Sequence, residues 1–205
     1  MTQDEKKEIQ KQRIKRYFID ATKDLLREEG LNSISTKKIG DRAGYSYATI
    51  YNYFSNFNEL ICISLEELAN EMKEILEEKS IVLENNIEKL IELINISIDY
   101  MIQNQHVYKL FLSTTIDYNY FKHTENKRFI HPAYNLLIST IKNIKEFSNF
   151  SDEDIKNFAD LVFTLFHSKI QFFLIQKYPD NVEDLKKDIF NNLNFLIKTI
   201  ESRAI

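Results

Sequence analysis

Residues 35–60 read STKKIGDRAGYSYATIYNYFSNFNEL and decide how the N-terminal part of the chain folds. Ser35 and Ser46 are preferred N-cap residues, and each precedes a short run with helical spacing of apolar side chains. Gly44 lies between the two runs, and glycine readily adopts the left-handed backbone conformation that commonly ends a helix. The stretch therefore predicts two short helices joined by a tight turn, the second of them covering residues 47–54.

The two predicted helices share a small core, and the second presents an unusual exposed face. Their apolar positions form a small shared core made of Ile39, Ala43, Ile50 and Phe54. On the second helix the opposite face carries a small residue, Ala48, which lets the backbone approach another molecule closely. Hydroxyl and amide groups surround it, and such groups bind DNA phosphates and base edges. A helix-turn-helix that reads DNA has this design, with the second helix entering the major groove.

The spacing of these residues resembles the tetracycline-repressor-like (TetR) family of bacterial transcription regulators. The residues that carry the resemblance are Ala21, Gly30, Ser35, Ile39, Ala43, Gly44, Ser46, Thr49, Ile50, Tyr51, Phe54 and Leu60. Together, the residue chemistry and the resemblance predict a DNA-binding set of Ser35, Thr36, Lys37, Ser46, Tyr47, Ala48, Thr49, Tyr51, Asn52 and Tyr53.

Four positions depart from the usual family pattern. Gly40 replaces an alanine, Tyr45 a valine or leucine, and Tyr53 a frequent histidine. Phe57 stands where a lysine commonly contacts phosphate, so the resemblance predicts one backbone contact fewer. The basic residues Lys6, Lys7, Lys11, Arg13, Lys15 and Arg16 are a candidate replacement, with a solvated, frayed terminus as the alternative.

The rest of the chain is also predicted to be helical. Only 3 Gly and 2 Pro occur in 205 residues, which leaves few turns for a many-stranded sheet. Apolar residues recur at steps of three and four in successive segments. We expect an all-α fold of about nine helices, with a helix-turn-helix DNA-binding domain over residues 1–57. Residues 58–205 are expected to form a helical ligand-binding and dimerisation domain.

Two C-terminal segments favour a homodimer. Residues 151–178 are apolar around most of the predicted helix, which indicates burial on several sides, and residues 182–202 repeat apolar positions in a heptad-like pattern. An internal core helix is the alternative. The family resemblance implies that these two helices pair with those of a second chain across a two-fold axis, and that the paired heads bind a palindromic operator in double-stranded DNA.

The middle helices contain the residues expected to contact a small molecule. Pockets between bundle helices with a few polar groups are usual ligand sites, although ordinary core packing is an alternative for each residue. The candidates are Tyr100, Tyr108, Phe111, Tyr134, Phe163, Phe166 and His167. His167 is the first choice for a polar contact because it lies one turn from Phe163 in an apolar run.

Other functional classes find little support in the sequence. The four histidines, His106, His123, His131 and His167, have no metal-ligand spacing, and one cysteine excludes a multi-thiolate site. No nucleotide or hydrolase motif occurs, so we expect no metal, no cofactor and no enzyme activity. A membrane span is not expected, because polar residues interrupt the most apolar run, residues 161–175.

The sequence thus predicts a cytoplasmic, dimeric transcriptional regulator. We expect a repressor that binds a specific operator and is released by an unknown small apolar or aromatic effector. The alternative is a DNA-associated or protein-interaction adaptor of the same fold that has no small-molecule switch.

Overall fold

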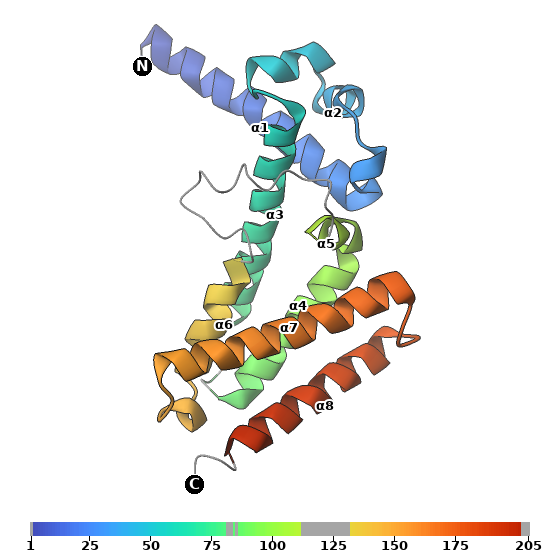
Figure 1. Ribbon diagram of the computed structural model, residues 1–205. Coiled ribbons are helices and arrows are strands. Elements are labelled where there is room, and N and C mark those ends of the chain that lie inside the picture. The colour runs from blue at the N-terminus through green and yellow to red at the C-terminus, as the bar shows by residue number, and fades with distance from the viewer. Residues whose placement is uncertain (1, 81–83, 85, 112–131, 202–205) are drawn as a thin grey trace. The chain divides into compact units, whose positions relative to one another are not determined.

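The computed structural model describes residues 2–80, 84, 86–111 and 132–201. All regular structure in these residues is helical (Figure 1). The α-helices are α1 (Gln3–Glu29), α2 (Thr36–Ala43), α3 (Phe57–Ser80), α4 (Ile87–Gln103), α5 (Gln105–Phe111), α6 (Pro132–Lys142), α7 (Asp152–Gln176) and α8 (Val182–Glu201). Three 3₁₀ helices are η1 (Leu31–Ser33), η2 (Tyr47–Asn52) and η4 (Lys145–Phe147). Counting η2 with the eight α-helices, the described residues confirm an all-α fold of about nine helices.

The contacts divide the chain into two compact units. The first contains residues 1–70 and 104–129, and the second contains residues 71–103 and 130–205, as far as these are described. One helix, α3, passes from the first unit into the second at Asn70. A domain boundary between residues 57 and 58 remains a prediction.

The first unit is built around the side of α1 that faces α2 and η2. Phe18, Leu25, Ile39 and Ile50 are almost inaccessible to solvent and form one cluster with Phe54 and Leu60. A second cluster joins α1 and α3 to α5, through Leu26, Ile61, Cys62, Leu65, Leu68, Val107 and Leu110. Burial of apolar surface in the first cluster fixes the position of η2 relative to α1, and the second cluster does the same for α3 and α5.

An ion-pair group also connects α1 with α3 inside the first unit. The Lys23 ammonium is 3.1 Å from the Glu67 carboxylate, although the Lys23 side chain is only 7% exposed. Arg16 contacts the same carboxylate at 2.8 Å and also pairs with Asp20. A buried cation is costly to leave unpaired, so Glu67 holds α3 in register with α1.

The second unit packs α7 against α6 and α8, and α4 against α6 and α8. Two ion pairs link α8 to its neighbours, Lys169 to Asp188 and Lys186 to Asp99, at 2.5 and 2.6 Å. In this unit α6 begins at Pro132, a residue that fits the first turn of a helix. It ends at Lys142 because Ile144 is extended, and a 3₁₀ turn follows.

Within the single chain α7 is not buried on several sides. One side of α7 is buried, whereas Leu161, Phe172 and Ile175 on the other side are 49–58% exposed. By length and composition alone α7 could cross a membrane, but one such helix is weak evidence because helices of soluble cores pass the same test. The exposed apolar side of α7 requires another explanation.

Candidate nucleic-acid interface and apolar pocket

Caps and a left-handed glycine set the geometry of α2 and the turn that follows it. The Ser35 hydroxyl accepts a hydrogen bond from the Lys38 backbone N–H at 3.2 Å, as an N-cap should. Gly44 ends α2 with φ 77° and ψ 26°, a left-handed conformation that residues with a Cβ rarely adopt. The Tyr45 N–H then donates to the Gly40 carbonyl oxygen at 2.9 Å. Residues 35–46 therefore form the cap and tight turn that the sequence predicts.

Gly40 allows the turn to pass very close to α2. A Cβ atom at this position would lie 2.8 Å from the Tyr45 carbonyl oxygen and 3.0 Å from the Tyr47 backbone nitrogen. Both neighbours are backbone atoms of the turn, so neither can rotate away as a side-chain end can. Glycine at this position, which departs from the family pattern, thus fits the close contact between α2 and the backbone of the turn.

We therefore expect Gly40→Ala to destabilise the first unit. Overpacking of this kind costs about 1–3 kcal/mol, which exceeds the gain of up to about 1 kcal/mol from replacing glycine inside a helix. Thermal unfolding of the variant measures the difference, and an exposed-site variant, Asn149→Ala, is the control. An unchanged or raised melting temperature for Gly40→Ala would contradict the close packing of the turn.

The second helix of the pair is η2, a 3₁₀ helix over residues 47–52 in place of the predicted helix over residues 47–54. Ile50 is fully buried, while Tyr47 and Tyr51 are 58% and 53% exposed. Ala48 and Asn52 are also exposed. The side of η2 that faces away from the core is thus a surface of two phenols, a methyl and an amide, as the residue types predict.

Ser46 precedes η2 but does not cap it in the predicted manner. Its side chain accepts no bond from the helix backbone, and its hydroxyl instead contacts the Thr49 hydroxyl at 2.9 Å. The 3₁₀ geometry is tighter than that of an α-helix. Ser46 and Thr49 therefore present a linked pair of hydroxyls at the start of η2.

The remaining predicted DNA-binding residues differ in exposure. Ser35 and Lys37 are exposed, and Thr36 is half-buried on α2. Tyr53 is also half-buried, with its ring 6.0 Å from the Phe18 ring. Phe57 packs against both clusters of the first unit, so its side chain supports the core.

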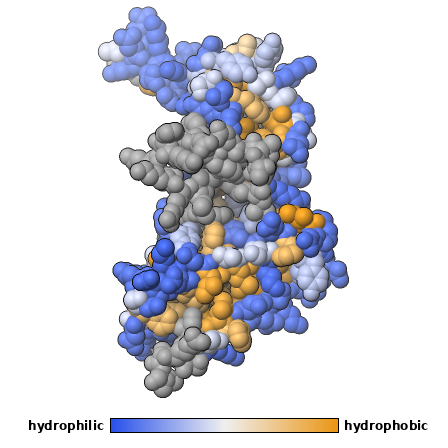
Figure 2. Space-filling view, in the orientation of Figure 1, coloured by the Kyte–Doolittle hydropathy of each residue, from blue (hydrophilic) through white to orange (hydrophobic). Residues whose placement is uncertain are grey.

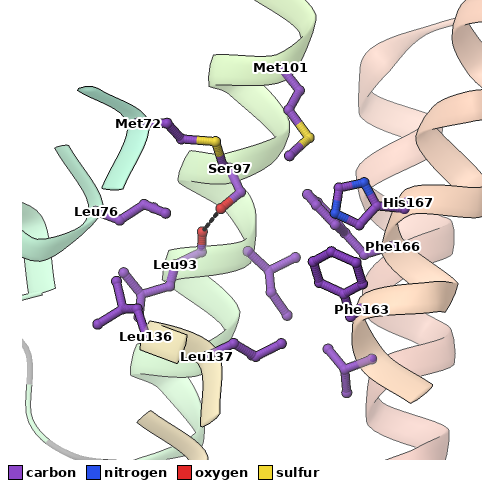
Figure 3. A pocket seen from close by; sticks show the side chains of 12 residues that line it. Met72, Leu76, Leu93, Ser97, Met101, Leu136, Leu137, Phe163, Phe166 and His167 are labelled. Atoms are coloured by element: carbon purple, nitrogen blue, oxygen red, sulfur yellow. Dashed lines mark hydrogen bonds between the residues drawn. The ribbon is translucent and has the colours of Figure 1, made fainter. Parts of the chain in front are cut away.

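The second unit contains an apolar pocket between its helices (Figure 3). Its volume is about 50 Å³, and its walls come from α3, α4, α6 and α7. The lining residues are Met72, Leu76, Leu93, Ile94, Ser97, Met101, Leu136, Leu137, Val162, Phe163, Phe166 and His167. The Ser97 hydroxyl donates to the Leu93 carbonyl oxygen at 2.8 Å, and among the described lining residues His167 contributes the other polar side chain.

Three of the seven predicted ligand contacts line this pocket, all on α7. The His167 ring lies 4.2 Å from the Phe163 ring and 4.9 Å from the Phe166 ring, measured between centroids. Tyr134 does not line the pocket, but its ring meets Phe163 edge-on at 5.3 Å and its hydroxyl donates to Asp160. The structure thus gathers Phe163, Phe166 and His167 into one wall.

The other three candidates lie elsewhere. Tyr100 is on α4 and does not line the pocket, while Tyr108 is 3% exposed in the first unit, where burial raises the pKa of its phenol. The side chain of Phe111 is outside the described residues, as are His123 and His131. Sequence reasoning missed Met72, Leu93 and Met101, because nothing distinguishes an apolar pocket wall from ordinary core before the helices are placed.

Comparison with known proteins finds a family match within the first unit and solved structures with a similar fold. Residues 18–61 match the family described as bacterial regulatory proteins, tetR family. Comparison with curated proteins gave no match.

Three solved structures have a similar fold over most of their length. The fatty acid degradation regulator FadR from Bacillus halodurans has 18% identity and a TM-score of 0.64, with 92% of each chain covered. FadR from Thermus thermophilus, a TetR-family repressor in complex with lauroyl-CoA, has 16% identity, covers 89% of this chain and 93% of its own, and gives a TM-score of 0.65. RolR in complex with resorcinol has 15% identity, 95% coverage of both chains and a TM-score of 0.65.

Proposed function

We propose that this chain, which has the DNA-binding domain and the fold of tetR-family bacterial regulatory proteins, is a dimeric repressor that binds a specific operator. One observation carries the proposal, namely the exposed side of η2, which is held on a fully packed core beside the capped helix α2. Tyr47 and Asn52 on that side can reach base edges, and Thr49 and Tyr51 can donate to phosphates. Such a protein acts where the chromosome is, in the cytoplasm.

The proposed dimer uses α7 and α8. Leu161, Phe172 and Ile175 share one side of α7, and Phe195 on α8 is 70% exposed. Figure 2 shows hydrophobic residues gathered along α7. Exposed apolar side chains repeated along two adjacent helices are typical of a self-complementary two-fold interface. Two DNA-binding heads related by that axis would read two half-sites of a palindrome.

The pocket of the second unit suggests an uncharged effector. None of the described residues that line it is Asp, Glu, Lys or Arg, so a charged group beside them would lose its hydration without compensation. His167 contributes to the wall an imidazole, a group that can hydrogen-bond hydroxyl and carbonyl groups. The pocket is small, at about 50 Å³, but Met72 and Met101 in its walls have flexible side chains that can make room for a larger effector.

Met72 connects effector binding to the DNA-binding head in this proposal. It lies on α3, and the first residue of α3 is Phe57, which packs against the core of the DNA-binding head. An effector that prefers a wider pocket would favour a different position of α3 and so a different separation of the two heads. The heads would then no longer fit successive major grooves, and the operator would be released.

Selection from a random DNA pool tests the proposed function. The full-length protein would be mixed with duplexes that contain 30 random base pairs, roughly three helical turns, and the bound duplexes would be amplified and sequenced. We expect an enriched inverted repeat whose half-sites are about one helical turn apart. Bound duplexes without any shared sequence would contradict the proposal.

Filling the pocket should reduce binding of an apolar probe. We expect the neutral dye N-phenyl-1-naphthylamine to fluoresce with the wild-type protein and to bind Leu137→Trp about tenfold more weakly, since an added indole ring occupies the pocket. Ile138→Trp, a half-buried neighbour on α6 that does not line the pocket, is the matched control. Equal dye affinity of Leu137→Trp and wild type would place the dye elsewhere and contradict the assigned pocket.

A further inference from the structure

The positive charge of the DNA-binding part is concentrated before the family domain begins. Residues 1–16 contain six Lys and Arg against three Asp and Glu, a net charge of +3. Residues 17–60 contain five against six, a net charge of −1. A domain that binds DNA through phosphates needs cations, and here the segment with α2 and η2 does not supply a surplus.

Most cations within residues 17–60 are also neutralised by neighbouring carboxylates. The Lys38 ammonium is 2.5 Å from Glu29, and Arg42 donates two hydrogen bonds to Glu28, at 2.7 and 3.0 Å. The hydrogen bonds from Arg42 lower the pKa of Glu28, which keeps that carboxylate ionised and paired. Lys23 is buried against Glu67, so these three cations already have protein partners.

The first half of α1 is an ordered helix and not a frayed terminus. The Thr2 hydroxyl accepts from the Glu5 N–H at 3.2 Å while Glu5 accepts from the Thr2 N–H at 2.7 Å, a capping box that starts α1 before the matched domain. Figure 1 shows this half of α1 extending away from α2 and η2, and Figure 2 shows it covered by hydrophilic residues. Its side chains therefore project from a defined frame.

Lys7, Lys11 and Lys15 form one row along this helix, which we call the basic row. They are spaced by four residues, with about 6 Å of helix rise between neighbours. The row lies on the side of α1 that, one turn further on, buries Phe18 against Tyr53 and Phe54 beside η2. The Lys15 ammonium lies 5.4 Å from the centre of the Phe54 ring, so the row begins beside the end of η2.

The outer two lysines of the basic row have exposed, uncommitted charges. Within the part of the chain that the structure describes, neither Lys7 nor Lys11 forms an ion pair, and both are exposed. Glu8, which follows Lys7 in the sequence, accepts a hydrogen bond from Gln12 at 2.7 Å and not from a lysine. The basic row therefore starts beside η2, and its two outer lysines form no ion pair with the described residues.

We propose that the basic row binds the DNA phosphates beside the half-site that η2 contacts, and that it provides most of the sequence-independent affinity. The inference rests on the proposed DNA-binding function. It explains how a domain with a net charge of −1, and with Phe57 in place of a phosphate-binding lysine, can still hold a polyanion. Specificity then comes from η2, and the ionic part of the affinity comes from α1.

The salt dependence of DNA binding tests this inference. The full-length protein and the variant Lys7→Gln, Lys11→Gln, Lys15→Gln would be titrated with a 30-base-pair duplex of mixed sequence at several NaCl concentrations. Each phosphate contact contributes about 0.9 to the slope of log K against log salt, so six lysines in a dimer should flatten the slope by about 5. The variant should bind more weakly than wild type at 0.1 M salt, and the difference should shrink as the salt concentration rises.

Two comparisons make the result decisive. Lys79→Gln, Lys145→Gln, Lys156→Gln removes the same charge from exposed positions elsewhere and should leave the slope unchanged. Lys7→Gln, Lys11→Gln keeps Lys15 over Phe54 and should still flatten the slope by about 3 to 4 without altering thermal unfolding. A wild-type slope in the three-lysine basic-row variant would overturn this inference while leaving the proposed function intact. Wild-type protein that bound no duplex at all would overturn both.

Discussion

The full-length variant Phe172→Glu, Phe195→Glu is expected to be a folded monomer that binds operator DNA at least about 100-fold more weakly than wild type. Both side chains are substantially exposed in the single chain, at 49% and 70%, so the substitutions should change its stability by less than about 0.5 kcal/mol. In the proposed dimer they would bury four carboxylates without partners, which association cannot compensate. The loss of the second head removes the gain from simultaneous binding to two half-sites.

Analytical ultracentrifugation and a mobility-shift titration with the selected duplex measure the two effects. Ser148→Glu, Asn149→Glu adds the same charge at exposed positions outside α7 and α8, and should remain a dimer with wild-type affinity. If the phenylalanine variant stayed dimeric, the proposed interface would be wrong. A monomer with undiminished operator affinity would show that pairing contributes little to binding.

The second large effect is expected at the DNA-binding surface. Lys37→Ala, Tyr51→Ala should weaken operator binding by about 100-fold, because a lost contact of this kind costs about 1–3 kcal/mol. Both side chains are exposed and neither belongs to the core, so the dimer and its melting temperature should be unchanged. A mobility-shift titration measures the affinity.

A neighbouring lysine provides the control for this variant. Lys38 follows Lys37 on α2, but its ammonium is engaged by Glu29 at 2.5 Å, so Lys38→Ala should weaken binding much less. Tyr51→Phe removes only the hydroxyl, so it separates the contribution of the hydroxyl to DNA binding from that of the ring. Wild-type affinity in the variant that lacks both Lys37 and Tyr51 would remove the proposed reading surface from α2 and η2.

Local rules predicted the DNA-binding head well. Ser35 and Gly44 mark the ends of α2 through caps, and caps depend on residues close in sequence. Ile39, Ile50 and Phe54 were assigned to the core by helical spacing, and the structure buries all three. The 3₁₀ geometry of η2 was not predictable from spacing alone, since three- and four-residue steps serve both kinds of helix.

The pocket was harder to predict because it depends on tertiary packing. Phe163, Phe166 and His167 share α7, so their proximity follows from helical spacing. Their neighbours Met72, Leu93 and Leu137 come from three other helices, and no local pattern connects these positions. Tyr108 illustrates the same limit, since its aromatic character suggested a ligand contact, whereas α5 places it in the core of the first unit.

The start of α1 shows what the structure adds to a charge count. The sequence left Lys7, Lys11 and Lys15 open between a phosphate contact and a frayed terminus. In the structure this segment is an ordered helix, because a capping box starts it at Thr2 and Lys15 lies over the Phe54 ring beside η2. Phe57 likewise changes meaning, from a missing cation to a side chain that packs against both clusters of the first unit.

The most direct test of the central claim, that η2 reads bases, compares the DNA sequences selected by two forms of the protein. Wild-type protein and Asn52→Ala would each select from the same pool of random duplexes. We predict that both enrich one inverted repeat and that the variant loses its preference at a single base pair in each half-site, at symmetry-related positions. The same preferences in both selections would contradict the assigned reading residue, and no enriched sequence with wild type would contradict the account as a whole.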